Sequence, residues 1–475
     1  MKLSQLIAVD NDVEITGIAV DSRKVRKGNL FLCVRGEHAD GHDYAEEALK
    51  NGAAVIVTER SLGFENEIVL PDTRRAAASL YATWYHNPQK ELKIFGVTGT
   101  NGKSSIVGIL QSIYRQAGYK VAICGTLGCF WDEKEYSLKN TTPLPETLYE
   151  LLREMVDDGV THLFMEVSSH ALALERVSEI EFYYGVFSNL TSEHLDFHGT
   201  MENYAQAKEK LFLQSENCVI NLDDAFGALV YPKYKRISIG YGKTEQAACR
   251  LDKILYRDLN GAVFTVRYQS QKHLFTTLLP GEYNLYNLLA AISVALHDGV
   301  AVETIAKAIS SFAGVKGRLE SVYQGEFTVF IDYAHTPDAL QRVLTELRKA
   351  SSNRLRVLFG CGGNRDKTKR PMMGRIAQTI ADDIIVTSDN SRNENPREII
   401  DDILSGMENL PSNHVVIVAD RREALKFMVQ TARRGDIILV AGKGHEEYEI
   451  NRSGRHPFSE SDIIYEALKQ FGFIT

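Results

Sequence analysis

Short apolar runs alternate with helical patterns along most of the chain. In the middle of the sequence, four runs bounded by polar turns lack the apolar–polar alternation of a half-exposed strand, which favours strands buried on both faces of a parallel sheet. They cover residues 120–124, 162–165, 184–187 and 218–221. Later runs, again with helical patterns between them, cover residues 328–331, 355–359, 384–387, 414–418 and 436–440. The pattern predicts an α/β fold with more than one sheet.

Breaks in this pattern divide the chain. The first 88 residues mix short strands, predicted at 28–34 and 53–58, with a helix at 44–51. His86-Asn87-Pro88 ends this part, and residues 251–279 are predicted to form two or three antiparallel strands around Asn260-Gly261. A helix is predicted over 282–297. At 475 residues the chain is too long for one core, and its length predicts about three domains.

A glycine-rich turn joins the predicted strand 94–97 to a helical pattern over residues 106–117. The turn and the start of the helix contain Thr98, Gly99, Thr100, Asn101, Gly102, Lys103, Ser104 and Ser105. This order of elements is typical of a loop that binds nucleotide phosphates, because backbone N–H groups at a helix N-terminus attract anions. Lys103 would contact the outer phosphates, and the Ser104 hydroxyl would bind Mg²⁺. The spacing departs from the common pattern, since Gly96 lies one residue too early.

The composition narrows the class of protein further. Hydrophobic residues make up 44% and charged residues 24% of the chain, the balance of a globular protein. The net charge of -8 argues against nucleic-acid binding, which usually needs a basic face. No apolar run reaches the ~20 residues of a membrane span, and the N-terminal apolar stretch is too short for a signal peptide. We therefore expect a cytoplasmic protein without a membrane span.

The cysteines give no sign of a metal site or of a disulfide framework. All six are scattered, at positions 33, 124, 129, 218, 249 and 361, and no CxxC pair occurs. Free thiols are expected.

Two further segments carry candidate chemistry. Glu166 ends the predicted strand 162–165, where a carboxylate in a phosphate-loop domain is a second oxygen ligand for Mg²⁺, although a surface carboxylate is also common there. Residues 194–208 read HLDFHGTMENYAQAK, with two histidines four residues apart but no HExxH zinc motif. Taken alone, Lys208 would be one more solvated helix lysine beside Lys210.

In order along the chain, these motifs resemble the Mur ligase family, which is related to folylpolyglutamate synthetase. The shared features include the Thr-Gly-Thr-x-Gly-Lys-Ser turn, the segment 194–208 and Gly-Arg-Leu-Glu at 317–320. The resemblance implies a three-domain architecture with a central P-loop-type, mainly parallel sheet and a C-terminal Rossmann-like α/β domain. The implied domains are an N-terminal UDP-MurNAc-binding domain (1–88), an ATP-binding domain (89–316) and an amino-acid-binding domain (317–475).

The resemblance also implies roles for residues around the phosphate loop. The catalytic set would be Lys103, Glu166, His194 and Lys208. Together with Ser104, the last three would hold Mg²⁺, with Lys208 carbamylated by CO₂ so that it offers an anionic oxygen. Nearby cations would lower the pKa of that lysine and favour the neutral amine that captures CO₂. Asn287, Arg318 and Asp332 would contact the nucleotide, although Asn287 could instead cap its helix.

Substrate contacts follow from the same match. Those implied for the UDP-linked sugar-peptide are Ser22, His38, Ala39, Asn140, Thr141, Thr142, Ser168 and Arg176. Leu174 replaces a glutamine usual in this branch, which puts one substrate hydrogen bond in doubt. Those implied for the incoming amino acid are Arg365, Asp389, Asn390, Ser391, Arg392, Gly442 and Glu446. Ser391 replaces the proline of the usual Asp-Asn-Pro-Arg motif and removes some backbone rigidity.

Arg392 points to the branch of the family that adds meso-diaminopimelate. A guanidinium offers a planar, bidentate partner for the distal carboxylate, which lysine lacks. The expected activity is ATP-dependent formation of an amide between UDP-N-acetylmuramoyl-L-alanyl-D-glutamate and meso-diaminopimelate through an acyl phosphate, by a monomer. The alternatives are a lysine-adding ligase of the same branch, a ligase adding D-Ala-D-Ala, and a nucleotide-gated binding protein or regulatory ATPase without ligase chemistry.

Overall fold

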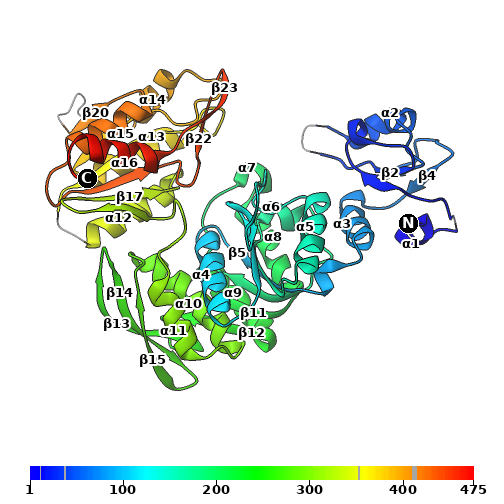
Figure 1. Ribbon diagram of the computed structural model, residues 1–475, viewed down its shortest axis with the longest axis horizontal. Helices are drawn as coiled ribbons and strands as arrows, with labels where there is room; N and C mark the ends of the chain where they lie inside the picture. Colours follow the sequence, from blue (N-terminus) through cyan, green and yellow to red (C-terminus); the bar gives the residue numbers. More distant parts are fainter. Residues whose placement is uncertain (11, 37–38, 351–352, 409–413, 475) are drawn as a thin grey trace. The chain divides into compact units, whose positions relative to one another are not determined.

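The computed structural model describes residues 1–10, 12–36, 39–350, 353–408 and 414–474. Figure 1 shows the helices and strands of these residues. The chain divides into two compact units. The first comprises Met1–Asp252, Val266–His273 and Tyr286–Ala308, and the second comprises Lys253–Thr265, Leu274–Leu285 and Ile309–Thr475. Across the described residues, none of the helices combines the length and apolar character that crossing a bilayer requires.

A small parallel sheet forms the N-terminal part of the first unit. Its strands, in sheet order, are β1 (Gly17–Ala19), β2 (Asn29–Leu32), β3 (Val55–Thr58) and β4 (Glu67–Val69). They are accompanied by α1 (Leu3–Leu6), α2 (Ala45–Lys50) and α3 (Thr73–Trp84). All residues of β2 and β3 are buried, and both strands were predicted. The Asp72 side chain caps α3 by accepting a hydrogen bond from the Arg75 N–H at 2.9 Å.

An eleven-stranded sheet follows, in the order β15-β14-β13-β12-β11-β10-β5-β9-β6-β7-β8. In chain order its strands are β5 (Lys93–Thr98), β6 (Val121–Gly125), β7 (Gly128–Trp131), β8 (Lys134–Tyr136), β9 (His162–Glu166), β10 (Phe182–Phe187), β11 (Ser215–Asn221), β12 (Ser238–Gly242), β13 (Cys249–Asp258), β14 (Gly261–Tyr268) and β15 (Gln271–Thr277). The four predicted apolar runs are β6, β9, β10 and β11, and β5 pairs in parallel with both β9 and β10. Residues 251–279 form three strands, the upper end of the prediction.

Helices connect these strands. They are α4 (Lys103–Gln116), α5 (Pro145–Asp157), α6 (Ser169–Ala173), α7 (Leu195–His198), α8 (Met201–Leu213), α9 (Ala225–Tyr234), α10 (Glu282–His297) and α11 (Val302–Ser311). Close packing against the sheet leaves little room at β5, where a Cβ on Gly96 would lie 2.7 Å from the Phe182 ring. The apolar side chains of α5 and of strands β6 and β9 share one core.

The second unit contains a six-stranded sheet in the order β16-β17-β21-β18-β19-β20. Its strands are β16 (Glu320–Gln324), β17 (Thr328–Asp332), β18 (Leu355–Phe359), β19 (Asp383–Val386), β20 (Val415–Ile417) and β21 (Ile437–Ala441). Only β16, at one edge, is antiparallel to its neighbour. The α/β class and the five strands predicted for this part are confirmed, and these five strands are parallel.

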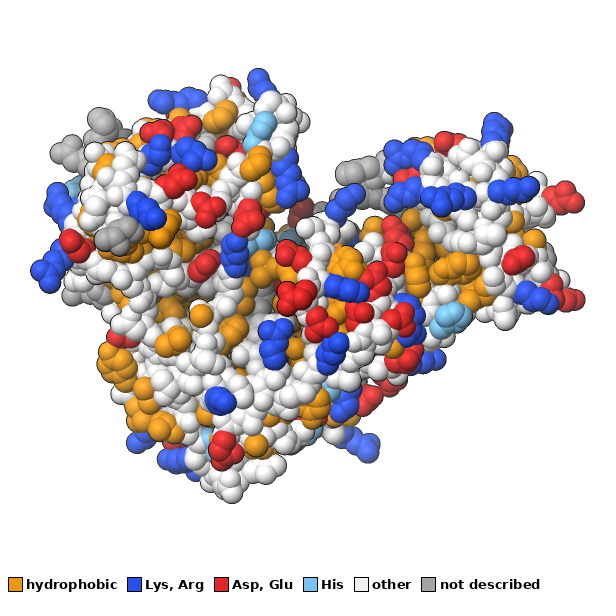
Figure 2. Space-filling view, viewed as in Figure 1, with side chains coloured by type: hydrophobic (Ala, Val, Ile, Leu, Met, Phe, Trp, Pro, Cys, Tyr) orange, Lys and Arg blue, Asp and Glu red, His pale blue; other side chains and the backbone are white. Residues whose placement is uncertain are grey.

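Helices cover both faces of this sheet. One apolar core includes side chains of α12 (Pro337–Ala350), α13 (Lys369–Ile380) and α14 (Pro396–Leu404). The other includes side chains of α15 (Arg421–Gln430) and α16 (Glu460–Gln470). A separate hairpin, β22 (Tyr448–Asn451) and β23 (Gly454–Pro457), lies between β21 and α16 in the chain. Figure 2 shows acidic and basic side chains interspersed on the visible face.

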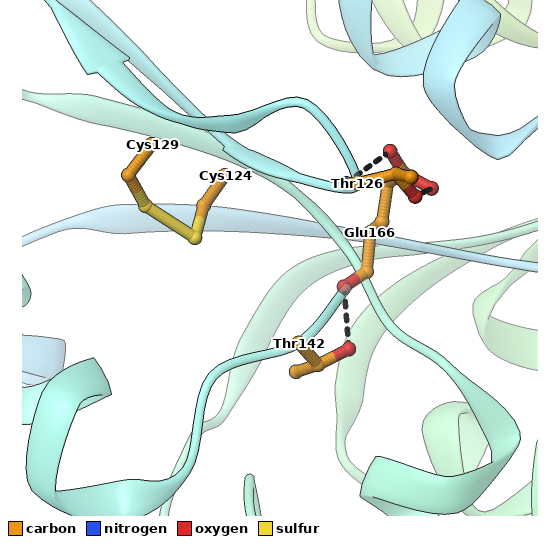
Figure 3. The surroundings of a disulfide bond; sticks show 5 residues. All are labelled: Cys124, Thr126, Cys129, Thr142 and Glu166. Atoms are coloured by element: carbon orange, nitrogen blue, oxygen red, sulfur yellow. Dashed lines mark hydrogen bonds between the residues drawn. A yellow bond between two sulfur atoms is a disulfide. The ribbon is translucent and has the colours of Figure 1, made fainter. Parts of the chain in front are cut away.

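The hairpin β6–β7 carries a disulfide between Cys124 and Cys129 (Figure 3). The prediction that all six cysteines are free thiols was therefore wrong for this pair. The two residues are five positions apart and show no motif, but the turn between the strands brings their Cα atoms to 4.2 Å. Both are buried among apolar side chains, which shields the bond from thiol reductants.

The other four cysteines are free and buried. Burial raises the pKa of the Cys33, Cys218, Cys249 and Cys361 thiols to about 12. They are therefore poor nucleophiles in the folded protein.

The disulfide can be checked by counting labelled thiols. After unfolding without reductant, iodoacetamide should label the four free cysteines, and after reduction it should label all six. Mass spectrometry of the intact chain measures the number of added groups. Six labels without reductant would show that Cys124 and Cys129 are not bonded.

Candidate functional site

The glycine-rich turn between β5 and α4 has a backbone that only glycine fits without strain. Gly102 precedes α4 with a φ of 89°, and a Cβ there would lie 2.3 Å from Oδ1 of Asn287. At Gly99 a Cβ would lie 1.9 Å from Oγ of Ser188. The turn thus lies tightly against the residue after β10 and against α10, and it leads directly into the N-terminus of α4, a position that favours phosphate binding.

Side chains of the turn are held by hydrogen bonds within the first unit. The Lys103 ammonium donates to the backbone oxygens of Gly99 and Thr100, both at 3.0 Å, so the side chain folds back over the turn. The Thr100 hydroxyl lies 3.1 Å from the hydroxyl of Tyr204 on α8. The Asn101 N–H donates to Oδ1 of Asn189 at 3.0 Å. The predicted residues at either end, Thr98 and Ser105, are buried.

Ser104 and Glu166, predicted from separate motifs, lie in contact. The Ser104 hydroxyl donates to Oε1 of Glu166 at 2.8 Å. Thr126, in the β6–β7 turn, donates to the same carboxylate through its N–H at 2.9 Å and its hydroxyl at 3.1 Å (Figure 3). No sequence motif marks Thr126, although it lies two residues after the predicted strand 120–124.

The donor set at this point suits a hard cation. Mg²⁺ takes oxygen ligands, often one or two carboxylates completed by substrate phosphates and water. Ser104 and Glu166 offer a hydroxyl and a carboxylate beside the phosphate-binding turn, so these residues fit the ion. Among the described residues, no three His, Cys, Asp or Glu side chains form a cluster that could hold a metal by themselves.

His194 immediately precedes α7, Lys208 lies on α8, and both are close enough to Lys103 of the turn to feel its charge. His194 has a left-handed backbone conformation with a φ of 57°, and burial lowers the pKa of its imidazole. The Lys208 side chain is buried, with its ammonium 4.5 Å from the ring centre of Tyr204. Burial and the nearby Lys103 hold the pKa of Lys208 well below its usual value, against an opposing effect of Glu193. A buried, readily neutralised lysine fits the chemistry of carbamylation.

A pocket of about 590 Å³ lies within the first unit. Four predicted substrate contacts line it, namely Asn140, Thr141, Ser168 and Arg176, together with His194. Arg176 donates through Nη1 to the Thr142 oxygen at 3.1 Å, while its buried Nε has no partner among the described residues. Leu174, at the position of the missing glutamine, also lines the pocket.

Three other predicted precursor contacts, Thr142, Ser22 and Ala39, are not among the residues that line this pocket. Thr142 is buried, and its hydroxyl donates to the Glu166 backbone oxygen at 2.9 Å (Figure 3). Ser22 donates to Glu47 at 3.0 Å. The Ala39 backbone oxygen accepts from the Gly36 N–H at 2.8 Å, and His38 lies outside the described residues.

The pocket lining also contains two arginines and a histidine that were not predicted from the sequence, Arg35, Arg74 and His170. Arg74 donates to the Arg35 backbone oxygen at 2.6 Å. The signal that could have found Arg35 is its place just beyond the end of β2, because ligands of parallel sheets lie outside the carboxyl ends of the strands.

In the second unit, six of the seven predicted amino-acid contacts lie in the loops that follow β19 and β21, and the seventh, Arg365, lies in the loop that follows β18. Asn390 donates to the Glu446 carboxylate at 2.7 Å and accepts from the Lys443 ammonium at 2.9 Å. Lys443 is completely buried and also donates to the Tyr448 oxygen at 2.8 Å. These bonds fix the segment Gly442-Lys443-Gly444 in place. A Cβ on Gly442 would lie 2.7 Å from the Asp389 carboxylate.

Arg392 and Arg365 both approach Gly362. A Cβ on that glycine would lie 2.9 Å from Nη1 of Arg392 and 3.8 Å from Cγ of Arg365. Arg392 donates to the Gly363 oxygen at 2.9 Å. Ser391 is buried, and its backbone oxygen accepts from the Glu394 N–H at 3.0 Å. The loop is therefore held without the usual proline.

Arg318 and Asp332 lie close together in the second unit. Arg318 comes shortly before β16, and Asp332 is the last residue of β17. Asp332 accepts from the N–H groups of Leu319 at 2.7 Å and Ala334 at 2.8 Å. Burial raises the pKa of this carboxyl, against the nearby Arg318. The Arg318 guanidinium lies 4.8 Å from the ring centre of Tyr333.

Comparison with known protein families gives three matches along the chain. Residues 14–82 match the Mur ligase family catalytic domain, residues 97–295 the Mur ligase middle domain, and residues 317–444 the Mur ligase glutamate ligase domain.

Individual relatives match over nearly the whole length. The UDP-N-acetylmuramoyl-L-alanyl-D-glutamate–2,6-diaminopimelate ligase of Clostridium botulinum (strain ATCC 19397 / Type A) is 40% identical over 470 residues, which are 97% of this chain and 96% of the relative. The ligase of the same name from Geobacillus kaustophilus (strain HTA426) is 40% identical over 474 residues, with the same coverage. A solved structure bearing this ligase name has a TM-score of 0.74 at 31% identity and covers 100% of both chains. The chain belongs to the Mur ligase family.

Proposed function

We propose that the protein is an ATP-dependent ligase that joins meso-diaminopimelate to UDP-N-acetylmuramoyl-L-alanyl-D-glutamate, a step of peptidoglycan precursor synthesis. The observation that carries the proposal is the contact between Ser104 and Glu166 at the glycine-rich turn. It places a hydroxyl and a carboxylate where a cation could meet the phosphates of ATP. The ligases named above, which are similar over nearly the full length, support the same reaction.

The reaction follows from charge and position. The distal carboxylate of the D-glutamyl residue attacks the γ-phosphorus of ATP and ADP leaves, giving an acyl phosphate. The amine of diaminopimelate then attacks the acyl carbon, and phosphate leaves. Lys103 and the N-terminus of α4 would offset the repulsion between the two anions of the first step. Because no protein nucleophile is required, positioning supplies most of the rate enhancement.

Binding of the precursor is assigned to the pocket of the first unit. The unpartnered Nε of Arg176 is a buried donor, and an anionic group of the precursor would satisfy it. Asn140, Thr141 and Ser168 add polar groups to the same lining. Ser22, His38 and Ala39 remain predicted contacts of the uridine end, and Thr142 would act from behind the lining.

Ser104, Glu166, His194 and a carbamylated Lys208 would hold Mg²⁺. When bound, the ion would neutralise charge on the transferring phosphoryl group. The carbamate requires a neutral amine, which the burial of Lys208 favours. Asn287, Arg318 and Asp332 would contact the nucleotide.

The amino acid is assigned to Arg365, Asp389, Asn390, Ser391, Arg392, Gly442 and Glu446 in the second unit. Arg392 would bind the distal carboxylate of diaminopimelate. Lysine lacks this carboxylate, so a bound lysine would leave the Arg392 guanidinium without a partner. In this scheme residues 1–88 bind the UDP-linked end, 89–316 bind ATP and 317–475 bind the amino acid. We infer that the enzyme acts as a monomer in the cytoplasm, where ATP and nucleotide-linked precursors are available.

The proposed function predicts which substrates ADP release requires. With ATP, Mg²⁺ and bicarbonate present, release should need both the UDP-linked dipeptide and diaminopimelate, and should fall when lysine or D-Ala-D-Ala replaces the latter. Chromatography of the products measures the new amide. Release of ADP that ignores both partners would instead identify a regulatory ATPase, and preference for lysine would identify the lysine-adding reaction.

Replacing Arg392 should weaken the use of diaminopimelate selectively. Arg392→Ala removes the proposed partner of a carboxylate, a loss of about 2–5 kcal/mol, or roughly 30- to 5,000-fold in kcat/KM for the amino acid. The KM values of ATP and precursor should stay unchanged. Arg397→Ala, which removes an exposed arginine of α14, is the matched control. Equal kcat/KM for the Arg392 variant and the wild type would contradict the assignment.

Lys208 can be tested by its modification as well as by activity. In the wild type, NMR with ¹³C-bicarbonate should show a carbamate resonance. Arginine retains the charge but cannot lose its proton or form a carbamate, so Lys208→Arg should lack this resonance. Its turnover should fall at least about 100-fold, the upper end of what loss of a supporting group costs a metal site. Lys210→Arg, which changes a nearby half-exposed lysine, should retain both the carbamate resonance and the turnover of the wild type. Full turnover in Lys208→Arg would refute the carbamate.

A further inference from the structure

One buried arginine lies beneath the two loops after β19 and β21, which carry six of the seven predicted amino-acid contacts. Arg421 is the first residue of α15, and its side chain is 1% exposed. It is not among the residues assigned above to ATP, precursor or amino acid. It lies at the end of the sheet, below the loops that follow β19 and β21, where its side chain can hold the backbone of both loops.

Its guanidinium makes three hydrogen bonds in three directions. Nη1 donates to the Ser388 oxygen at 3.0 Å, and Nη2 donates to the Ala441 oxygen at 2.8 Å. Nε donates to Oε1 of Glu460 at 2.7 Å. The planar fork of arginine can serve all three acceptors at once.

The two backbone acceptors stand immediately before the two site loops. Ser388 precedes Asp389, and Ala441 precedes Gly442. In the sheet, β18 lies between β19 and β21, so the loops leave strands that are not direct neighbours. Arg421 therefore bridges the two loops from below, at their starting points.

Glu460 fixes the arginine in turn. It is the first residue of α16, its side chain is 1% exposed, and Ser459 caps the helix by accepting from the Asp462 N–H at 3.3 Å. Burying such a pair carries a desolvation cost that apolar side chains would avoid, which indicates a role in specifying geometry. Nearby, burial alone would raise the pKa of Asp389, but Lys443 and Arg421 hold it below its usual value.

We propose that Arg421, oriented by Glu460, is a positioning residue that sets the spacing between the loop bearing Arg392 and the loop bearing Glu446. This inference rests on the proposed function. The predicted contacts for the two charged ends of the amino acid lie on different loops, so their spacing decides whether one ligand reaches both. The direct bond from Asn390 to Glu446, at 2.7 Å, joins the loops farther along the chain, and the alternative is that this bond suffices without Arg421.

Arg421→Lys separates these possibilities. A lysine keeps the charge but offers one nitrogen, which cannot reach Glu460, Ser388 and Ala441 in the fork geometry. The KM of diaminopimelate should rise about tenfold or more, the factor that 1.4 kcal/mol of binding energy represents. The KM values of ATP and the UDP-linked dipeptide should stay within about twofold of the wild type, a much smaller change in binding energy than the tenfold rise expected for diaminopimelate.

Arg356→Lys is the matched control. Arg356, on β18 of the same sheet, is also buried, and it donates to the Met428 oxygen at 3.1 Å and the Thr431 hydroxyl at 2.7 Å. It should show a comparable loss of Tm without a change in the KM of diaminopimelate. Glu460→Gln keeps the size of the side chain, removes its charge, and should raise the same KM by a smaller factor.

The outcomes distinguish this inference from the function on which it rests. A wild-type protein that forms no amide with diaminopimelate refutes the proposed function, whatever the variants do. An active wild type with an unchanged KM in Arg421→Lys overturns the positioning role. So does an equal rise in Arg356→Lys, since that would reflect general loosening of the domain. If Arg421→Lys does not fold, an unchanged KM in Glu460→Gln overturns the role, and a selective rise supports it.

Discussion

The parallel pairing of β5 with β9 is the constraint on which the first unit's site depends. In that register Val97 lies opposite Glu166, so the carboxylate emerges at the same edge of the sheet as the glycine-rich turn. The following helix then brings the Ser104 hydroxyl to 2.8 Å from it. Neither motif would form a cation site alone. A shift of one residue in this register would turn Glu166 to the opposite face of the sheet.

In the second unit the candidate residues are again placed by parallel strands, but other interactions hold them in position. These residues follow the carboxyl ends of the strands, and buried charges fix the loops. Lys443 is completely buried and bonds to Asn390, while Arg421 bonds to the backbone below both loops. These bonds explain how the loop keeps its form with Ser391 in place of proline. Charged groups that are satisfied on all sides make rigid supports because moving them would leave a buried charge unpaired.

Much of this could be predicted from the sequence, because it follows from local pattern. The strand, turn and helix around residues 94–117 and the buried parallel strands were recognisable from apolar spacing. Contacts set by tertiary packing were not. Lys208 and Lys210 look alike in the sequence, yet only Lys208 is fully buried. The Cys124–Cys129 bond depends on a hairpin turn, and Arg35 reaches the pocket through the arrangement of the N-terminal sheet.

The central claim is that the carboxylate of the precursor, and not water, receives the phosphoryl group. It is tested most directly by labelling the distal D-glutamyl carboxylate with ¹⁸O and analysing the phosphate formed with ATP and diaminopimelate. Attack by the carboxylate leaves one of its labelled oxygens bound to phosphorus when the amine displaces the phosphate. The account predicts one ¹⁸O in each phosphate released. Unlabelled phosphate, formed at the same rate as the amide or in its absence, would contradict it.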